Sequence, residues 1–199
     1  MPNKEYSSSH EMRLYDRQNR RLYINESERM AFVQAAQKAP LHIEALCLTL
    51  LYSGCRLSEA LELKVCSLQI EDKILAVRSL KKRSRHHVRE IPVPEDLVKL
   101  LRLQAQLKDR ESFLWSREGE MVHRVTAYRW IKEVMQQADI HGAHASPKGL
   151  RHSYGVHAVR CGIVLNLIQR WMGHASIKTT AIYANAVGAE EREIAQRMW

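Results

Sequence analysis

One stretch in the middle of this sequence favours β-strands, and helix-forming segments flank it on both sides. Strand-like segments at 65–70, 74–80 and 87–93 are separated by a turn at 71–73 and a basic segment at 81–86, and Pro94 ends the region. Short apolar segments bounded by such turn signals predict a small three-stranded antiparallel sheet. One small sheet among many helices predicts an α+β fold that is mainly α-helical.

Helix signals occupy the rest of the chain from residue 25 onward. Asn25 and Glu28 have the spacing of a capping box, which predicts a helix to about residue 38. A strongly apolar segment at 41–52 predicts a core helix that Gly54 ends. Further helices are expected at about 57–63, 95–108, 124–138, 147–160, 163–172, 176–186 and 189–198. We expect a flexible basic arm at residues 1–21 and one domain at 22–199, because 199 residues suit a single core.

The charge of the chain indicates a polyanionic partner. Lys and Arg number 31 against 22 acidic residues, for a net charge of +9. The sequence has neither a secretory signal nor an apolar segment of membrane-spanning length, so we expect no membrane contact. Its four cysteines form no C-x-x-C pair, which is typical of reduced thiols. We therefore expect a cytoplasmic protein, and the charge leaves nucleic acid as one candidate partner.

Arg56 is the first candidate for a phosphate-binding residue. It follows the predicted break at Gly54 and begins the next helix, and Glu59 lies one turn later. Glu59 can hold the guanidinium in place, and a guanidinium held in this way suits bidentate binding of a phosphate. An arginine taken alone is more often an ordinary surface residue.

Lys148 and Arg151 form a second cationic pair near the start of a predicted helix. Ser146 is a plausible N-cap and Pro147 a plausible first helical residue. Residues three apart project from one face, where the positive end of the helix dipole adds to their attraction for an anion. An ordinary capped helix with two exposed cations is the alternative interpretation.

The remaining candidates lie in the basic turn and near the C-terminus. Five cations occur within residues 81–89, and such a turn either contacts DNA phosphates or is simply solvated. His174 follows Gly173, and Tyr183 lies nine residues later. Each of these two is more often structural when taken alone. Together with two arginines, however, a histidine and a tyrosine supply what attack on a DNA phosphate requires without a metal.

This set of motifs resembles the catalytic domain of the tyrosine recombinases, also called phage-type integrases. The resemblance covers about residues 22–199, and the spacing from Arg151 to Tyr183 fits the family without a gap. The family's site contains an arginine, a hairpin lysine, a histidine or lysine, a second arginine, a histidine or tryptophan, and a nucleophilic tyrosine. The matching residues are Arg56, Lys81 (with Lys82 as the alternative), Lys148, Arg151, His174 and Tyr183.

The resemblance implies a role for each matching residue in site-specific DNA recombination. Tyr183 would attack the scissile phosphate to form a 3′-phosphotyrosyl bond, while Arg56 and Arg151 hold its non-bridging oxygens. His174 would donate to the same oxygens. Lys81 would protonate the departing 5′-oxygen.

The sequence departs from the family pattern in two places. Lys148 stands where histidine is commoner, and a cation is a worse general base than neutral imidazole, so Lys148 would assist either Tyr183 or the phosphate. Typical members also carry a helical core-binding domain, whereas only about 20 residues precede the match here. The chain therefore resembles the short members that contain only the catalytic domain, such as the recombinases that invert fimbrial switches.

By resemblance, the partners are double-stranded DNA and further copies of the chain, as a tetramer in the synaptic complex, with an accessory DNA-bending protein as a further candidate. No cofactor and no metal are implied. Three alternatives remain open at this point. The chain could be a catalytically idle DNA-binding regulator, a type IB topoisomerase, or a metal-dependent nuclease that uses histidines such as His86, His87, His141 and His144.

Overall fold

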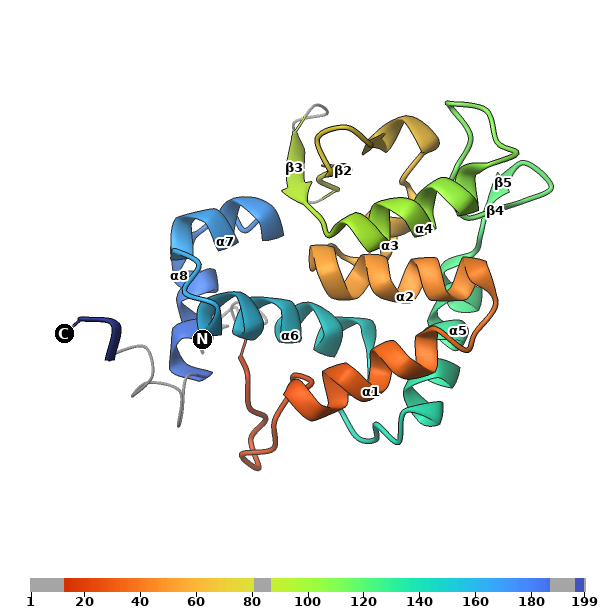
Figure 1. The fold of residues 1–199 in the computed structure, drawn as a ribbon. Helices are drawn as coiled ribbons and strands as arrows, with labels where there is room; N and C mark the ends of the chain where they lie inside the picture. The colour runs from red at the N-terminus through yellow and green to blue at the C-terminus, as the bar shows by residue number, and fades with distance from the viewer. Residues whose placement is uncertain (1–12, 81–86, 187–195, 199) are drawn as a thin grey trace, which may run out of the picture.

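The fold is built around one buried helix, as a computed structural model of residues 13–80, 87–186 and 196–198 shows (Figure 1). This helix, α2 (Leu41–Ser53), has nine buried residues among its 13, which agrees with its apolar sequence. It packs against α4 (Glu95–Ala105) and α6 (Pro147–Arg160). Helices α1 (Glu26–Ala36) and α5 (Arg124–Gln137) pack against each other and against α2.

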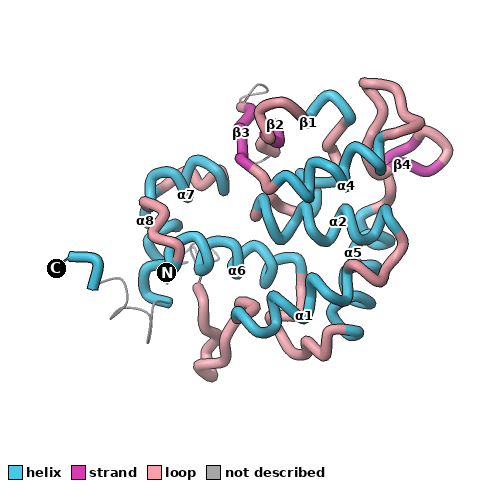
Figure 2. Tube along the Cα trace, viewed as in Figure 1, coloured by secondary structure: helices cyan, strands magenta, loops and turns pink. Residues whose placement is uncertain are grey.

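A three-stranded antiparallel sheet lies at one edge of these helices, where Figure 2 draws its strands in magenta. Its strands are β1 (Leu68–Gln69), β2 (Ile74–Arg78) and β3 (Val88–Pro92), in the order β1-β2-β3. Leu75 pairs with Ile91 in the register, and both side chains are fully buried. The alternation of buried and exposed residues along β3 is that of a sheet with one face on the core. The predicted class, α+β and mainly helical, is confirmed.

Three local segments differ from the sequence-based expectation. Residues 65–67 form a 3₁₀ turn, η1 (Val65–Ser67), because the N–H groups of Val65 and Cys66 donate to a loop at residues 110–112 and not to a strand. A second hairpin, β4 (Ser116–Arg117) with β5 (Glu120–Met121), was not predicted. The predicted helix at 176–186 divides into α8 (Ile177–Ala181) and a 3₁₀ turn, η2 (Ile182–Ala186).

Three predicted helix caps, at Asn25, Gly54 and Ser146, are where the sequence placed them. Asn25 accepts from the Glu28 N–H, and the Glu28 carboxylate accepts from the Asn25 N–H, which completes the capping box. Gly54 ends α2 with φ of 59°, in the left-handed region that glycine adopts at low cost. Ser146 caps α6 by accepting from the Gly149 N–H at 3.2 Å. The Gly54 cap ends α2 just before Arg56, and the Ser146 cap begins α6, which carries Arg151.

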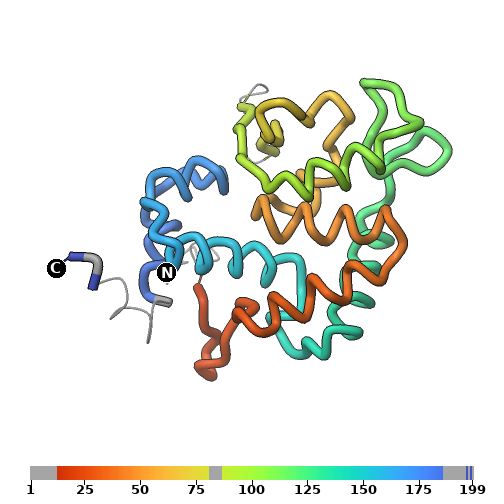
Figure 3. Tube along the Cα trace, in the orientation of Figure 1, coloured from red at the N-terminus to blue at the C-terminus, as the bar shows by residue number. Residues whose placement is uncertain are grey.

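The C-terminal elements form a layer of their own beside α6, shown in blue in Figure 3. Helix α7 (Leu165–Met172) contacts α6, α8 and β3, and η2 packs on α6. This layer has a small second core, which consists of Leu14, Val156, Ala158, Ile168, Met172 and Tyr183. The C-terminal layer therefore brings residue 183 against α6 and also brings the end of α7 close to the sheet.

Several predicted features fall outside the described residues. They include Lys81 and Lys82, most of the basic arm at 1–21, and most of the tail helix expected at 189–198, of which only η3 (Gln196–Met198) is described. Leu14, at the start of the described chain, is buried, and its carbonyl accepts from the Leu22 N–H at 2.8 Å. Within the described ranges, no helix combines the length and the apolar character that crossing a membrane requires.

Candidate active site

Arg56 lies at the turn between α2 and α3 (Leu57–Leu61), as its motif predicted. Its Nη1 donates to Glu59 Oε1 at 2.9 Å, and its backbone N–H donates to Glu59 Oε2 at 2.9 Å. The Glu59 side chain is fully buried, whereas that of Arg56 is 28% exposed. The buried carboxylate therefore orients Arg56 from the protein interior and leaves part of the guanidinium accessible to a ligand.

Arg151 is more buried than Arg56, and backbone carbonyls hold its side chain in place. Its side chain, on the second turn of α6, donates from Nη1 to the Gly54 carbonyl and from Nη2 to the Met172 carbonyl, both at 2.6 Å. Burial and the neighbouring charge of Arg56 lower the pKa of Arg151 to about 10, so it remains a cation at neutral pH. Arg151 thus joins the turn that carries Arg56 to the loop that precedes His174.

A cavity of about 310 Å³ lies between α3 and the start of α6. Three of the six predicted residues line it, Arg56, Lys148 and Arg151, and Arg124 from the start of α5 adds a further cation. Among the described residues no carboxylate lines the cavity; the lining consists of Arg56, Leu57, Ser58, Arg124, Pro147, Lys148, Arg151 and His152. Cations gathered at a helix start, with the carboxylate that pairs with Arg56 buried behind it, are suited to bind a phosphate.

Tyr183, in η2, is fully buried beside this cavity and does not line it. Its ring stacks on His174, with centroids 6.2 Å apart and an interplanar angle of 17°. It also lies directly against Gly155 of α6, where a Cβ atom would come within 2.5 Å of the ring. Burial raises the pKa of Tyr183 to about 12, although Arg151 and Arg56 act in the opposite direction. The hydroxyl is therefore protonated in this arrangement.

His174 has one ring nitrogen without a hydrogen-bond partner among the described residues. Its Nδ1 lies 2.9 Å from Thr180 Oγ1, and its Nε2 is buried and unpaired. Burial, followed by the charges of Arg151 and Arg56, lowers the pKa of His174 to about 3, so the ring is neutral. In the tautomer in which the Thr180 hydroxyl donates to Nδ1, the ring proton resides on Nε2, from which it can be donated to an anion.

His152 belongs to this site, and sequence reasoning did not select it. Its Nδ1 lies 3.3 Å from the Tyr183 hydroxyl, and the same side chain lines the cavity. Burial, with Lys148 and Arg151 adding to it, lowers the pKa of His152 to about 4. A signal was present in the sequence, because residues 148, 151, 152 and 155 share one face of a helix.

The structure thus gathers five of the six predicted residues. Arg56, Lys148 and Arg151 share the cavity, and His152 separates it from the buried pair His174 and Tyr183. Lys81, the sixth residue, lies outside the described ranges.

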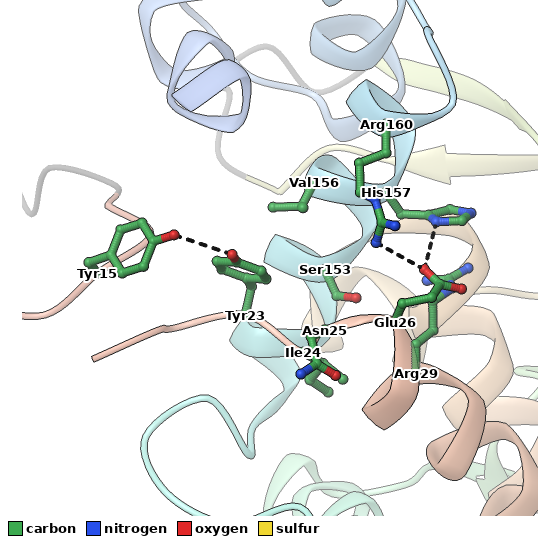
Figure 4. Close-up of a pocket in the computed structure, with 10 residues that line it drawn as sticks. All are labelled: Tyr15, Tyr23, Ile24, Asn25, Glu26, Arg29, Ser153, Val156, His157 and Arg160. Atoms are coloured by element: carbon green, nitrogen blue, oxygen red, sulfur yellow. Dashed lines mark hydrogen bonds and ion pairs between the residues drawn. The ribbon is translucent and has the colours of Figure 1, made fainter. Parts of the chain in front are cut away.

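A second cavity, of about 230 Å³, contains none of the six predicted residues (Figure 4). It lies between α6 and the segment that leads into α1, where Glu26 contacts His157 and Arg160 at 3.4 Å each. Two of the histidines considered for a metal site have other partners: His141 contacts Asp139, and His144 contacts Glu28. Across the described part of the chain, no three His, Cys, Asp or Glu side chains are grouped as metal ligands.

Comparison with known proteins places the chain in a family. The sequence model of the phage integrase family matches residues 20–189. This chain belongs to the phage integrase family. A tyrosine recombinase of Thermosipho africanus is 29% identical over 149 residues, which are 75% of this chain and 51% of that protein. The tyrosine recombinase XerA of Pyrococcus furiosus is 29% identical over 179 residues, which are 87% of this chain and 60% of that protein.

Solved structures agree with this assignment. The crystal structure of a XerA recombinase superposes with a TM-score of 0.75 at 26% identity, over 88% of this integrase chain and 64% of that one. XerH in a pre-cleavage complex with its difH substrate gives a TM-score of 0.70 at 19% identity, over 85% and 55% of the two chains, which shows the shared fold. The chain spans 51% and 60% of the two curated relatives named above.

Proposed function

We propose that this integrase-family chain is a site-specific DNA recombinase that cleaves and rejoins DNA through a 3′-phosphotyrosyl intermediate. The observation that carries the proposal is the cavity lined by Arg56, Lys148 and Arg151, with the Tyr183 hydroxyl one side chain away behind His152. A strongly cationic cavity next to a protected phenol suits attack on a phosphodiester, because the cations stabilise the charge that develops in the transition state.

In this proposal the cations and His174 bind the scissile phosphate. Arg56 and Arg151 neutralise the non-bridging oxygens, and Arg151 does so from a position set by two backbone carbonyls. The unpaired Nε2–H of His174 donates to one of these oxygens. Lys148, exposed on the first turn of α6, acts as a third cation on the phosphate.

Attack by Tyr183 requires two proton transfers. The phenol proton passes to a neutral acceptor, for which the described chain offers His152 Nδ1 at 3.3 Å. The phenol oxygen then bonds to phosphorus, the bond to the 5′-oxygen breaks, and Lys81 donates a proton to that oxygen. Because Tyr183 is fully buried, its hydroxyl has to move past His152 into the cavity when DNA binds.

The phosphotyrosyl bond stores the energy of the broken phosphodiester, so religation consumes no nucleotide cofactor. Double-stranded DNA is the proposed substrate, in line with the net charge of +9 and with the DNA-bound relative XerH. Exchange of two strands between two duplexes needs four such sites, so we propose a tetramer in the synaptic complex, with residues 22–199 as the catalytic domain.

A suicide DNA substrate, nicked so that the cleaved end is lost, tests the proposal. The wild-type chain should form a protein–DNA adduct that survives denaturant. Tyr183→Phe should form none and still bind DNA, because only the nucleophilic oxygen is removed. An adduct that persists in Tyr183→Phe would refute the assignment. Equal cleavage on DNA without any specific site would favour topoisomerase-like relaxation over recombination.

A further inference from the structure

Arg89, the second residue of β3, is a buried cation that the proposed chemistry does not use. Its side chain is only 1% exposed. Nη2 donates to Glu59 Oε2 at 2.6 Å, and Nε donates to the Trp171 carbonyl at 2.7 Å. Nε and Nη2 form one edge of the planar guanidinium, so a single rigid fork connects β3 to α3 and to the end of α7.

The first contact of this fork acts on Arg56. Glu59 bridges two arginines, because Oε1 accepts from Arg56 Nη1 at 2.9 Å while Oε2 accepts from Arg89. Burial by itself would raise the pKa of Glu59, but the hydrogen bond and charge of Arg89 bring this pKa below its ordinary value. Arg89 therefore keeps the Glu59 carboxylate ionised, and an ionised carboxylate is what orients Arg56.

The second contact acts on the loop that carries His174. The last carbonyls of α7 are each bound by an arginine, that of Trp171 by Arg89 and that of Met172 by Arg151. Gly173 continues the chain with φ of 67°, and a Cβ there would lie 3.2 Å from the Arg89 side chain. The left-handed turn before His174 is thus packed directly on the Arg89 guanidinium.

We propose that Arg89 is a positioning residue that fixes Arg56 and His174 relative to each other at the phosphate. The inference rests on the proposed function. Arg89 touches no reacting atom in this scheme; it acts through Glu59 on the one side and through the Trp171 carbonyl on the other. A lysine could retain the charge next to Glu59 but not both contacts, because one ammonium cannot reproduce the planar fork.

The test compares Arg89→Met with wild type in single-turnover cleavage at saturating DNA. By analogy with groups that orient metal ligands, the rate should fall on the order of 10–100-fold with DNA affinity unchanged. The cleavage rate of Arg89→Lys should lie between the rates of Arg89→Met and wild type. Arg29→Met is the matched control, since Arg29 is also a buried arginine but lies on α1 against Tyr52. This control should cleave like wild type.

A substrate with a methylphosphonate at the scissile position separates positioning from a general structural effect. The methyl group removes the negative charge that Arg56 neutralises, so most of the Arg89→Met loss should disappear on this substrate. Equal losses on both substrates, or no loss on normal DNA, would overturn the inference. If the wild-type chain forms no adduct on any substrate, the proposed function fails and the inference fails with it.

A double variant keeps the test decisive if Arg89→Met folds poorly. In Glu59→Gln/Arg89→Met the two fully buried charges are removed together, so no fully buried charge is left unpaired, and Arg56, the third member of the cluster, is 28% exposed. The midpoint of thermal unfolding should recover towards that of wild type, while the slow cleavage of normal DNA should persist. Recovery of both stability and cleavage would show that Arg89 serves only the fold.

Discussion

The phosphate-binding half of the candidate site and its nucleophile half are held in different ways. Arg151 is fixed by two 2.6 Å hydrogen bonds to backbone carbonyls, and Arg56 by a buried carboxylate. Tyr183 is fully buried in a short 3₁₀ turn, and a 3.3 Å contact with His152 is the hydrogen bond described for its hydroxyl. We infer that the phosphate-binding half is assembled before DNA arrives, whereas the nucleophile is held away from the cavity.

The largest expected effect on the cleavage rate comes from replacing Arg151, in the phosphate-binding half of the site. Arg151→Lys leaves a cation but cannot reach both the Gly54 and Met172 carbonyls and also bind a phosphate. Cleavage should slow by about 10²–10³-fold, by analogy with the loss of a transition-state donor. Single-turnover rates on the suicide substrate measure this loss. A rate close to wild type would mean that the fixed geometry of Arg151 is unimportant.

A smaller effect is expected from a substitution that disturbs the packing of Tyr183, in the nucleophile half of the site. In Gly155→Ala the new Cβ would lie within 2.5 Å of the Tyr183 ring, which has to shift. Overpacking of this kind costs about 1–3 kcal/mol, although alanine is the better helix former. The free energy of unfolding should therefore fall, and the pKa of Tyr183 should move down from about 12 as burial is relieved.

Denaturant unfolding and an ultraviolet titration of tyrosine measure the two effects of Gly155→Ala. Gly162→Ala would be a poor control because that glycine has φ of 75°. Ala158→Gly, one turn further along the same helix and in the same second core, shows instead what a change of helix propensity together with the loss of one buried methyl group does to stability. Unchanged Tyr183 ionisation in Gly155→Ala would contradict the close packing of the stored ring.

The effect expected to be smallest near neutral pH is that of the two buried histidines on stability, because it appears only as the pH falls below about 6.5. His152 and His174 have pKa values lowered to about 4 and about 3, so the folded state holds both neutral. Unfolding lets them bind protons below pH about 6.5, the ordinary value for histidine. Their contribution to stability is therefore complete above pH 6.5 and is lost as the pH falls towards 4 and 3, at up to ~1.4 kcal/mol per pH unit for each histidine.

His152→Gln isolates one of these histidines. The amide can still hydrogen-bond to the Tyr183 hydroxyl but does not titrate, so the slope of the unfolding free energy between pH 6.5 and 5 should become shallower. Urea unfolding at several pH values gives this slope for both proteins. An identical slope would show that His152 is not held neutral by burial.

The sequence predicted those features of the site that depend on local chemistry. The Asn25 capping box, the left-handed Gly54 and the Ser146 cap each involve residues within a few positions of one another. The family motifs likewise located Arg56, Lys148 and Arg151, which the structure brings to one cavity. Propensity and motif spacing are sufficient for features of this kind.

The contacts that hold the site together could not be predicted, because they join distant parts of the chain. The Arg151 bond to Gly54 spans 97 positions and the Arg89 bond to Trp171 spans 82. His152 becomes the neighbour of Tyr183 only because η2 packs on α6. The second hairpin escaped prediction because its turn, at Glu118 and Gly119, lacks the Asn-Gly or Asp-Gly signal.

A crystal structure of Tyr183→Phe bound to DNA with an intact scissile phosphate would test the contrast between the two halves most directly. We expect the Arg151 bonds to Gly54 and Met172 to be unchanged from the free protein, with the phosphate in the cavity between Arg56 and Arg151. The ring of residue 183 should have left its position against Gly155 and His174 and point at the phosphorus. A ring still buried at Gly155 beside a fully bound phosphate would contradict the account.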